Sequence, residues 1–132
     1  MVSPKKSVLL VEDDFVVHGV IAKTLKQWDL EIVHARDGNE AKKQIIQNGG
    51  GFGLFILDLI LPDGPTGWEI LDLIRSRPEV SDTSVLVLTG VAMSDEEEKR
   101  LKRTADVVMR KQQFDIATFK KAMDKLLEAK DR

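Results

Sequence analysis

The stretch "FILDLILPDG", residues 55–64, places one aspartate, Asp58, inside a run that is otherwise apolar from Leu54 to Leu61. An ionised carboxylate that is buried without a partner strongly destabilises a protein core. Asp58 therefore either lies at a strand end that faces water, or has charged neighbours that give it a chemical role. The residues that follow the other predicted strands decide between these two interpretations.

The composition indicates one domain with a hydrophobic core. The chain has 132 residues, of which 42% are hydrophobic, and a net charge of −2, which favours neither nucleic acid nor a membrane surface as a partner. It has no cysteine, so a disulfide framework and a thiolate metal site are excluded. No apolar run approaches the about 18 residues of a membrane span, and no signal-peptide pattern is present. We expect a single cytoplasmic domain over residues 1–132, with its core between about residues 6 and 128.

Short apolar runs alternate with longer amphipathic segments along the chain. The predicted strands are Ser7–Val11, Leu30–His34, Leu54–Leu57, Val85–Leu88 and Val107–Met109. The predicted helices are Phe15–Trp28, Gly38–Gln47, Trp68–Arg75, Ser94–Arg103 and Phe114–Ala129. This alternation predicts an α/β fold with a doubly wound, five-stranded parallel sheet. Because such strands are covered on both faces, their apolar residues are continuous rather than alternating.

Local signals refine this organisation. Ser94 and Glu97 have the spacing of a capping box at the start of the fourth helix. The glycine-rich segment 49–53 follows a helix and precedes a strand, the reverse of the order in a dinucleotide-binding loop, so we interpret it as a helix stop and flexible turn. His18 and His34 are far apart in sequence, and we interpret both as structural rather than metal-binding.

Reactive side chains follow the strands at one edge of the predicted sheet. Glu12, Asp13 and Asp14 follow the first strand, Asp58 ends the third, and Thr89 and Lys111 follow the fourth and fifth. Open sheets of this type bind ligands beyond the carboxyl ends of their strands. Two carboxylates about 4 Å apart repel each other by about 4 kcal/mol at an effective dielectric near 20. A hard divalent cation removes this repulsion, and Mg²⁺ is typically held by carboxylates together with a phosphate.

A magnesium ion beside Asp58 would make this carboxylate a plausible nucleophile toward phosphorus. Lys111 and Thr89 could then supply the cation and the donor that a transferring phosphoryl group requires. The second interpretation of Asp58, a carboxylate with charged neighbours, is therefore favoured.

Four motifs carry a resemblance to a known family: "VLLVEDD", "FILDLILPDG" with the later Gly67, "VLVLTG" and "VVMRK". In this order and at this spacing, from Val8 to about Leu127, the chain resembles the receiver domain of two-component response regulators. The resemblance implies a flavodoxin-like (βα)5 fold with the strand order 2-1-3-4-5. It also implies a signalling switch that catalyses only its own phosphorylation and dephosphorylation.

The resemblance assigns a role to each residue that matches the motifs. Asp58 corresponds to the phosphoacceptor, Thr89 to the hydroxyl that contacts the phosphoryl group, and Lys111 to the lysine that pairs with it. The implied Mg²⁺ ligands are Glu12, through a water molecule, Asp13, Asp58 and the backbone carbonyl of Ile60. Asp14 then falls outside the pocket as the N-cap of the first helix. An alternative register uses Asp13 and Asp14 as the acidic pair.

The sequence departs from the family pattern within the fifth strand, directly after the site lysine, and in the loop after Asp58. The usual proline after the lysine is Gln112, which predicts a trans peptide bond and an altered loop. The usual aromatic residue three positions before the lysine is Val108, which leaves aromatic coupling in doubt. The loop between Asp58 and Gly67 is one residue longer than usual. Ile60 and Val91 flank the expected phosphoryl position with apolar side chains, which favours slow self-dephosphorylation.

The resemblance implies that a sensor histidine kinase or phosphotransfer protein phosphorylates Asp58. The switch would act on an effector protein or output domain through the face of the fourth helix, fifth strand and fifth helix. One alternative is a receiver-like interaction module that works without phosphorylation, which the substitutions at Gln112 and Val108 motivate. Another is a phosphatase of the haloacid-dehalogenase type, but the second aspartate of those enzymes is Ile60 here.

Overall fold

The structure is a computed structural model that describes residues 7–90 and 92–130. Val91 and the ends of the predicted domain, residues 1–6 and 131–132, lie outside the described residues. The strands are β1 (Ser7–Val11), β2 (Glu31–Ala35), β3 (Phe52–Asp58), β4 (Ser84–Thr89) and β5 (Val107–Arg110). They form one sheet in the order β2-β1-β3-β4-β5, and every paired strand runs parallel to its neighbour. The predicted fold class and strand order are confirmed.

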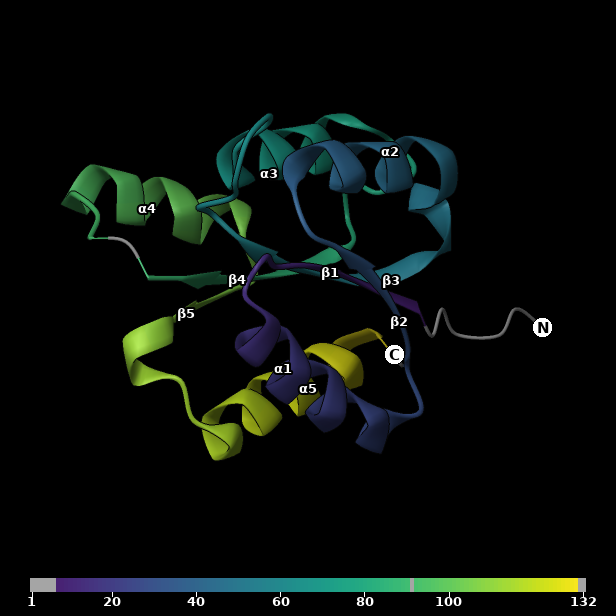
Figure 1. Ribbon diagram of the computed structural model, residues 1–132, viewed down its shortest axis with the longest axis vertical. Coiled ribbons are helices and arrows are strands. Elements are labelled where there is room, and N and C mark those ends of the chain that lie inside the picture. Colours follow the sequence, from purple (N-terminus) through teal and green to yellow (C-terminus); the bar gives the residue numbers. More distant parts are fainter. Residues whose placement is uncertain (1–6, 91, 131–132) are drawn as a thin grey trace.

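Helices cover both faces of this sheet. The α-helices are α1 (Phe15–Leu25), α2 (Gly38–Asn48), α3 (Gly67–Ser76), α4 (Asp95–Thr104) and α5 (Ile116–Lys130). Helices α1 and α5 lie on one face, and α2, α3 and α4 lie on the other (Figure 1). Within the described part of the chain, no helix combines the length and the apolar character needed to cross a membrane.

Consecutive residues of a strand pack alternately into two separate hydrophobic cores, one on each face of the sheet. In β1, Leu9 and Val11 pack in the core beneath α2, α3 and α4, whereas Val8 and Leu10 pack in the core beneath α1 and α5. All four side chains are at most 1% exposed. Because successive side chains point to opposite faces of a strand, two buried faces require a continuous apolar run. The sequence "SVLLV" meets this requirement.

The glycine-rich turn is shorter than predicted. Gly49–Gly51 form the 3₁₀ turn η2, but Phe52 and Gly53 already belong to β3. The pairing with β1 shifts at this point, because Ser7 faces Phe52 and Val8 faces Leu54. Gly53 is thus the extra residue of a β-bulge, a common position for glycine. The interpretation of segment 49–53 as a turn is therefore correct for its first three residues and wrong for the last two.

Two helix ends also differ from the prediction. Helix α1 ends at Leu25, and the 3₁₀ turn η1 (Lys26–Trp28) completes the predicted segment. Helix α5 begins two residues later than predicted, because the 3₁₀ turn η3 (Lys111–Gln113) follows β5. The carboxylate of Asp115 then accepts hydrogen bonds from the backbone N–H and the hydroxyl of Thr118, as an N-cap residue does.

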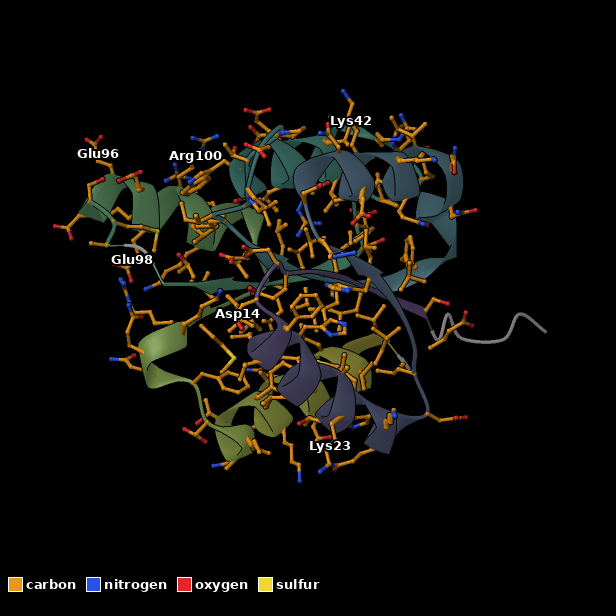
Figure 2. All side chains as sticks on the ribbon, viewed as in Figure 1. Asp14, Lys23, Lys42, Glu96, Glu98 and Arg100 are labelled. Atoms are coloured by element: carbon orange, nitrogen blue, oxygen red, sulfur yellow. The ribbon has the colours of Figure 1, made fainter. Side chains whose placement is uncertain are left out.

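Helix α4 has the predicted capping box and little buried surface. The Ser94 hydroxyl accepts a hydrogen bond from the Glu97 N–H, and the Glu97 carboxylate accepts one from the Ser94 N–H. Leu101 is the one buried residue among the ten described residues of α4. Glu96 points away from the sheet into solvent (Figure 2). Most of the charged surface of α4 therefore faces solvent.

Candidate functional site

The topology brings one lysine to two acidic side chains. Strand β1 ends one residue before Glu12, β3 ends at Asp58, and these two strands are neighbours in the sheet. Lys111 follows β5 and reaches back across the sheet edge, where its Nζ lies 2.8 Å from Asp58 Oδ2 and 3.0 Å from Glu12 Oε1. The side chain of Asp58 is only 4% exposed. A strand end facing water therefore does not explain Asp58, whereas a charged neighbour does.

Glu12 is the most deeply buried acid of the site. Its side chain is 1% exposed, and Oε1 accepts hydrogen bonds from Lys111 Nζ and from the Asp14 N–H. Burial, together with the negative charge of Asp58, raises the pKa of Glu12 above its usual value. Burial lowers the pKa of Lys111, but its hydrogen bonds to Asp58 and Glu12 outweigh this effect and raise the pKa above its usual value. Lys111 is therefore a permanent cation in this site.

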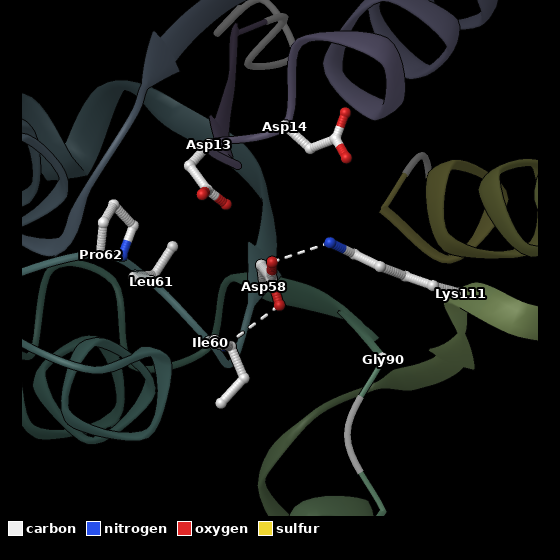
Figure 3. A pocket seen from close by; sticks show the side chains of 8 residues that line it. All are labelled: Asp13, Asp14, Asp58, Ile60, Leu61, Pro62, Gly90 and Lys111. Atoms are coloured by element: carbon white, nitrogen blue, oxygen red, sulfur yellow. Dashed lines mark hydrogen bonds and ion pairs between the residues drawn. The ribbon is translucent and has the colours of Figure 1, made fainter.

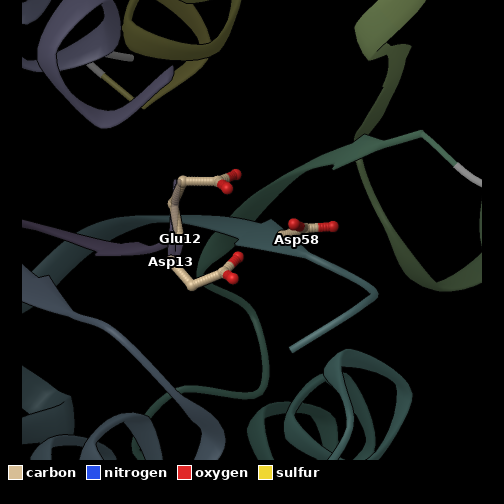
Figure 4. A group of neighbouring side chains, drawn as sticks. All are labelled: Glu12, Asp13 and Asp58. Carbon is tan, nitrogen blue, oxygen red and sulfur yellow. The ribbon is translucent and has the colours of Figure 1, made fainter. Parts of the chain in front are cut away.

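Three carboxylates form a candidate cation site. One oxygen each from Glu12, Asp13 and Asp58 lies within 4.8 Å of the others (Figure 4). The second oxygen of Glu12, Oε2, is buried and has no hydrogen-bond partner among the described residues. A set of ligands made only of oxygen atoms suits a hard divalent cation such as Mg²⁺. A bound cation would give the buried Oε2 the partner that it lacks, either directly or through a water molecule.

Asp13, Asp58 and Lys111 line an open cavity of about 460 Å³, whereas the buried Glu12 joins the site through its contact with Lys111. The lining residues are Asp13, Asp14, Asp58, Ile60, Leu61, Pro62, Gly90 and Lys111 (Figure 3). The Ile60 N–H donates a hydrogen bond of 3.1 Å to Asp58 Oδ1, so both oxygens of Asp58 have donors. The side chain of Ile60 is 57% exposed at the cavity rim.

Asp14 has two roles: it caps α1, and it lines the cavity. Its Oδ1 accepts hydrogen bonds from the N–H groups of Val16 and Val17, which confirms the predicted N-cap of α1. It also lines the cavity, so the expectation that it falls outside the pocket is wrong. Because Asp14 follows Asp13 directly, its backbone lies at the rim while its carboxylate turns toward α1 (Figure 3). The carboxylate cluster contains Glu12 and Asp13, which favours the first of the two registers.

Thr89 is the predicted site residue that stands apart. It ends β4 and is fully buried, and it is not among the described residues that line the cavity. The next residue, Gly90, does line it. The structure thus brings Glu12, Asp13, Asp58 and Lys111 together, and of these Glu12, like Thr89, is buried and does not line the cavity.

Gly67 packs directly against the backbone of Asp58 and Leu59. Its N–H donates a hydrogen bond of 3.0 Å to Leu59 O, so the first residue of α3 lies directly against the end of β3. A Cβ atom at this position would lie 2.2 Å from Asp58 O and 2.4 Å from Leu59 Cα. The sequence marked Gly67 as the last glycine of a family motif and as the end of a loop, but did not predict its contact with β3. A Thr-Gly pair before the apolar stripe of α3 is the signal that could have located this contact.

Two histidines that are distant in sequence lie in contact beside the site. The rings of His18 and His34 stack with their centroids 3.7 Å apart. His34 Nε2 is 2.7 Å from the backbone oxygen of Glu12, so this pair braces the end of β1. Burial and the neighbouring His34 lower the pKa of His18. Sequence separation gave no indication of this contact, because it depends on how α1, which contains His18, lies against β2, which contains His34.

Asp13→Asn tests the repulsion within the acidic cluster. Removing this exposed charge is expected to raise the unfolding free energy without divalent cation by about 1 kcal/mol, because it relieves repulsion by Glu12 and Asp58. The stabilisation that Mg²⁺ adds by binding the native state is expected to disappear. Urea unfolding with and without Mg²⁺ measures both effects. Asp14→Asn is the control, since asparagine also caps helices well; an equal gain in this variant would contradict the prediction.

A buried aspartate held by a lysine, within an acidic cluster at the carboxyl edge of a doubly wound sheet, is the arrangement expected of a phosphoacceptor domain. The family model described as the response regulator receiver domain matches residues 8–124. The chain therefore belongs to the response regulator receiver domain family, and it is a signalling switch of two-component systems.

Individual proteins agree with this assignment. Transcription factor prr1 of Schizosaccharomyces pombe is 35% identical over 89 residues, which cover 67% of this chain and 16% of that protein. Chemotaxis response regulator CheY4 of Vibrio cholerae is 26% identical with a TM-score of 0.77, over 91% of this chain and 97% of that one. A sensor histidine kinase receiver domain from Pseudomonas aeruginosa PAO1, with a coordinated magnesium ion, shares the fold at 21% identity and a TM-score of 0.78, over 93% and 98% of the chains. The chain spans 15–16% of the length of the curated relatives that it matches.

Proposed function

We propose that Asp58 accepts a phosphoryl group from a phosphohistidine of a sensor histidine kinase or phosphotransfer protein. The observation that carries this proposal is the contact of Lys111 Nζ with a carboxylate that is 4% exposed and yet lines an open cavity. A buried carboxylate facing a cavity is accessible to a reacting group and has little water around it. Lys111 Nζ lies 2.8 Å from Asp58 Oδ2, where it can also meet the oxygens of an incoming phosphoryl group.

Each residue contributes a distinct part of this reaction. A carboxylate oxygen of Asp58 forms a bond to phosphorus while the bond from phosphorus to the donor's imidazole nitrogen breaks, and the electron pair stays on that nitrogen. Lys111 shifts from the carboxylate to the phosphoryl oxygens as their charge becomes exposed to it. The Ile60 N–H, 3.1 Å from Asp58 Oδ1, fixes the carboxylate plane during the attack. The Thr89 hydroxyl donates a hydrogen bond to a phosphoryl oxygen once the domain is phosphorylated.

Mg²⁺ is the cation that these residues would hold. Glu12, Asp13, Asp58 and the backbone carbonyl of Ile60 are the ligands, with Glu12 acting through a water molecule. When bound, the ion neutralises the charge of the three carboxylates and of the incoming phosphoryl group. The buried and unpartnered Glu12 Oε2 supports this assignment, since a hydrated cation supplies donors that no described residue supplies.

The phosphorylated domain then acts on an effector protein or output domain. The proposed contact face consists of the edge strand β5 with α4, on one face of the sheet, and α5, on the other (Figure 1). The low burial of α4 supports this choice, because a weakly packed helix changes position at little free-energy cost. The phosphoryl group would shift a two-state equilibrium of this face. Slow self-dephosphorylation was predicted from the apolar pair Ile60 and Val91. Ile60 lines the cavity, but Val91 lies outside the described residues, so slow self-dephosphorylation stays a prediction.

Acetyl phosphate and Mg²⁺ test the proposal directly. The wild-type protein is expected to gain the mass of one phosphoryl group, and Asp58→Asn is expected to gain none, because an amide oxygen is not a nucleophile of comparable strength. Intact-mass spectrometry measures this difference. Asp72→Asn, an exposed aspartate of α3, is the control and should be modified like the wild type. Equal modification of Asp58→Asn and wild type would refute the assignment, and absence of modification and of beryllofluoride binding in the wild type would favour an interaction module that needs no phosphate.

A further inference from the structure

Gln112, which follows the site lysine, makes a contact that the proposed reaction does not use. Its Nε2 donates a hydrogen bond of 2.9 Å to the backbone oxygen of Gly90. The turn after β5 is thereby tied to the residue that follows β4. The peptide bond between Lys111 and Gln112 is trans, as the sequence predicts, and the 3₁₀ turn η3 turns the Gln112 amide toward Gly90.

Gly90 is held by the same turn from a second side. A Cβ atom at Gly90 would lie 3.6 Å from Lys111 Cδ and 3.9 Å from Lys111 Cβ, so its backbone packs along the lysine side chain. Lys111 in turn is bound to Asp58 and Glu12. Figure 3 shows Gly90 and Lys111 lining the same side of the cavity. A displacement of Gly90 therefore acts on both of these interactions of the turn.

The burial of Thr89 shows why this connection matters. Thr89 is fully buried and does not line the cavity, whereas Gly90 does. A contact of its hydroxyl with a phosphoryl group on Asp58 would draw Thr89 toward the cavity, and we infer that Gly90, the next residue, is displaced with it. The hydrogen bond from Gln112 to Gly90 opposes this movement, because it is lost when the Gly90 carbonyl leaves its position in this structure.

We propose that Gln112 is a positioning residue: its hydrogen bond to Gly90 holds the Thr89–Gly90 segment in the unphosphorylated arrangement and weakens the response of the domain to phosphorylation. This inference rests on the proposed phosphorylation of Asp58. An interaction made in one state only shifts the equilibrium between two states by its own net free energy. One net hydrogen bond corresponds to a roughly two- to tenfold change in an equilibrium constant.

Beryllofluoride with Mg²⁺, a stable mimic of the phosphoryl group, tests the inference by calorimetric titration. Gln112→Met keeps the length of the side chain but has no donor, and it is expected to bind beryllofluoride about two- to tenfold more tightly than the wild type. Gln113→Met is the matched control. This neighbouring glutamine is exposed, no side-chain hydrogen bond is found for it in the described structure, and its replacement should leave the affinity unchanged.

A second measurement separates positioning from a general effect on stability. Without ligand, Gln112→Met should lower the equilibrium constant for folding by the same factor, whereas with saturating beryllofluoride and Mg²⁺ its stability should equal that of the wild type. A purely structural hydrogen bond would lower both stabilities alike, and this result, or an unchanged or weaker affinity, overturns the inference. Failure of the wild type to bind beryllofluoride would overturn the proposed function together with it, so the two failures are distinguishable.

Discussion

Gly67→Ala is expected to lower the unfolding free energy by about 3 kcal/mol or more, because overpacking against fixed atoms is strongly destabilising. The new Cβ would lie 2.2 Å from Asp58 O and 2.4 Å from Leu59 Cα. Both are backbone atoms at the end of a central strand, so no side-chain rotation relieves the clash. Helix α3 has to move away from β3, and the hydrogen bond from the Gly67 N–H to Leu59 O is lost.

Urea unfolding compares this variant with Gly19→Ala. Gly19 lies inside α1, and outside the surrounding helix backbone no atom lies within 4 Å of the position that a Cβ would take, so alanine there should stabilise the protein by about 0.5–1 kcal/mol. The same substitution thus has opposite signs at two glycines. Because the clash involves Asp58, modification by acetyl phosphate should also slow in Gly67→Ala. A loss below about 1 kcal/mol would show that α3 can shift without strain, contrary to the prediction.

Arg75→Met is expected to destabilise the protein by about 3 kcal/mol, since it leaves three partly buried carbonyl groups and one carboxylate without their donor. The Arg75 guanidinium donates to the backbone oxygens of Thr104, Ser81 and Thr83, at 2.7, 3.0 and 2.7 Å, and to Asp106 Oδ2 at 3.2 Å. The arginine side chain is 24% exposed, so water replaces these donors only in part. One side chain therefore joins α3, the start of β4 and the end of α4.

Arg77→Met is the matched control for this substitution. Arg77 makes an ion pair of 3.1 Å with Glu79, and the two side chains are 31% and 41% exposed. Such a surface pair contributes at most about 1 kcal/mol. Chemical denaturation should therefore rank Arg75→Met far below Arg77→Met in stability. Equal losses would mean that the carbonyl groups around Arg75 are well hydrated in the native state.

The parts of the structure that the sequence predicted are those that local patterns determine. Continuous apolar runs located all five strands, and "EDD", Asp58 and Lys111 at the ends of three of them predicted the acidic cluster and its lysine. The ends of strands and helices were predicted less accurately. The bulge at Gly53 depends on pairing with β1, and the late start of α5 depends on the 3₁₀ turn at Lys111–Gln113. Neither feature is encoded in the segment itself.

The contacts that escaped prediction join residues from different elements. His18 and His34 meet because α1 packs over β2, and Gln112 reaches Gly90 because β4 and β5 are neighbours. The burial of Thr89 likewise depends on the packing around the end of β4 rather than on its position after an apolar run. Spacing along a chain cannot specify such contacts, since they require the relative placement of two elements to within about one hydrogen-bond length.

Helix α4 is anchored unequally at its two ends. Its last residue, Thr104, offers its carbonyl oxygen to Arg75, and Leu101 is buried in the last turn. In its first turn Asp95, Glu96 and Glu97 face solvent, and Glu98 contacts β5 through an ion pair with Arg110, at 3.7 Å. A displacement of Gly90 that is passed on to α4 would therefore tilt the N-terminal end of the helix, while its C-terminal end stays fixed at Thr104.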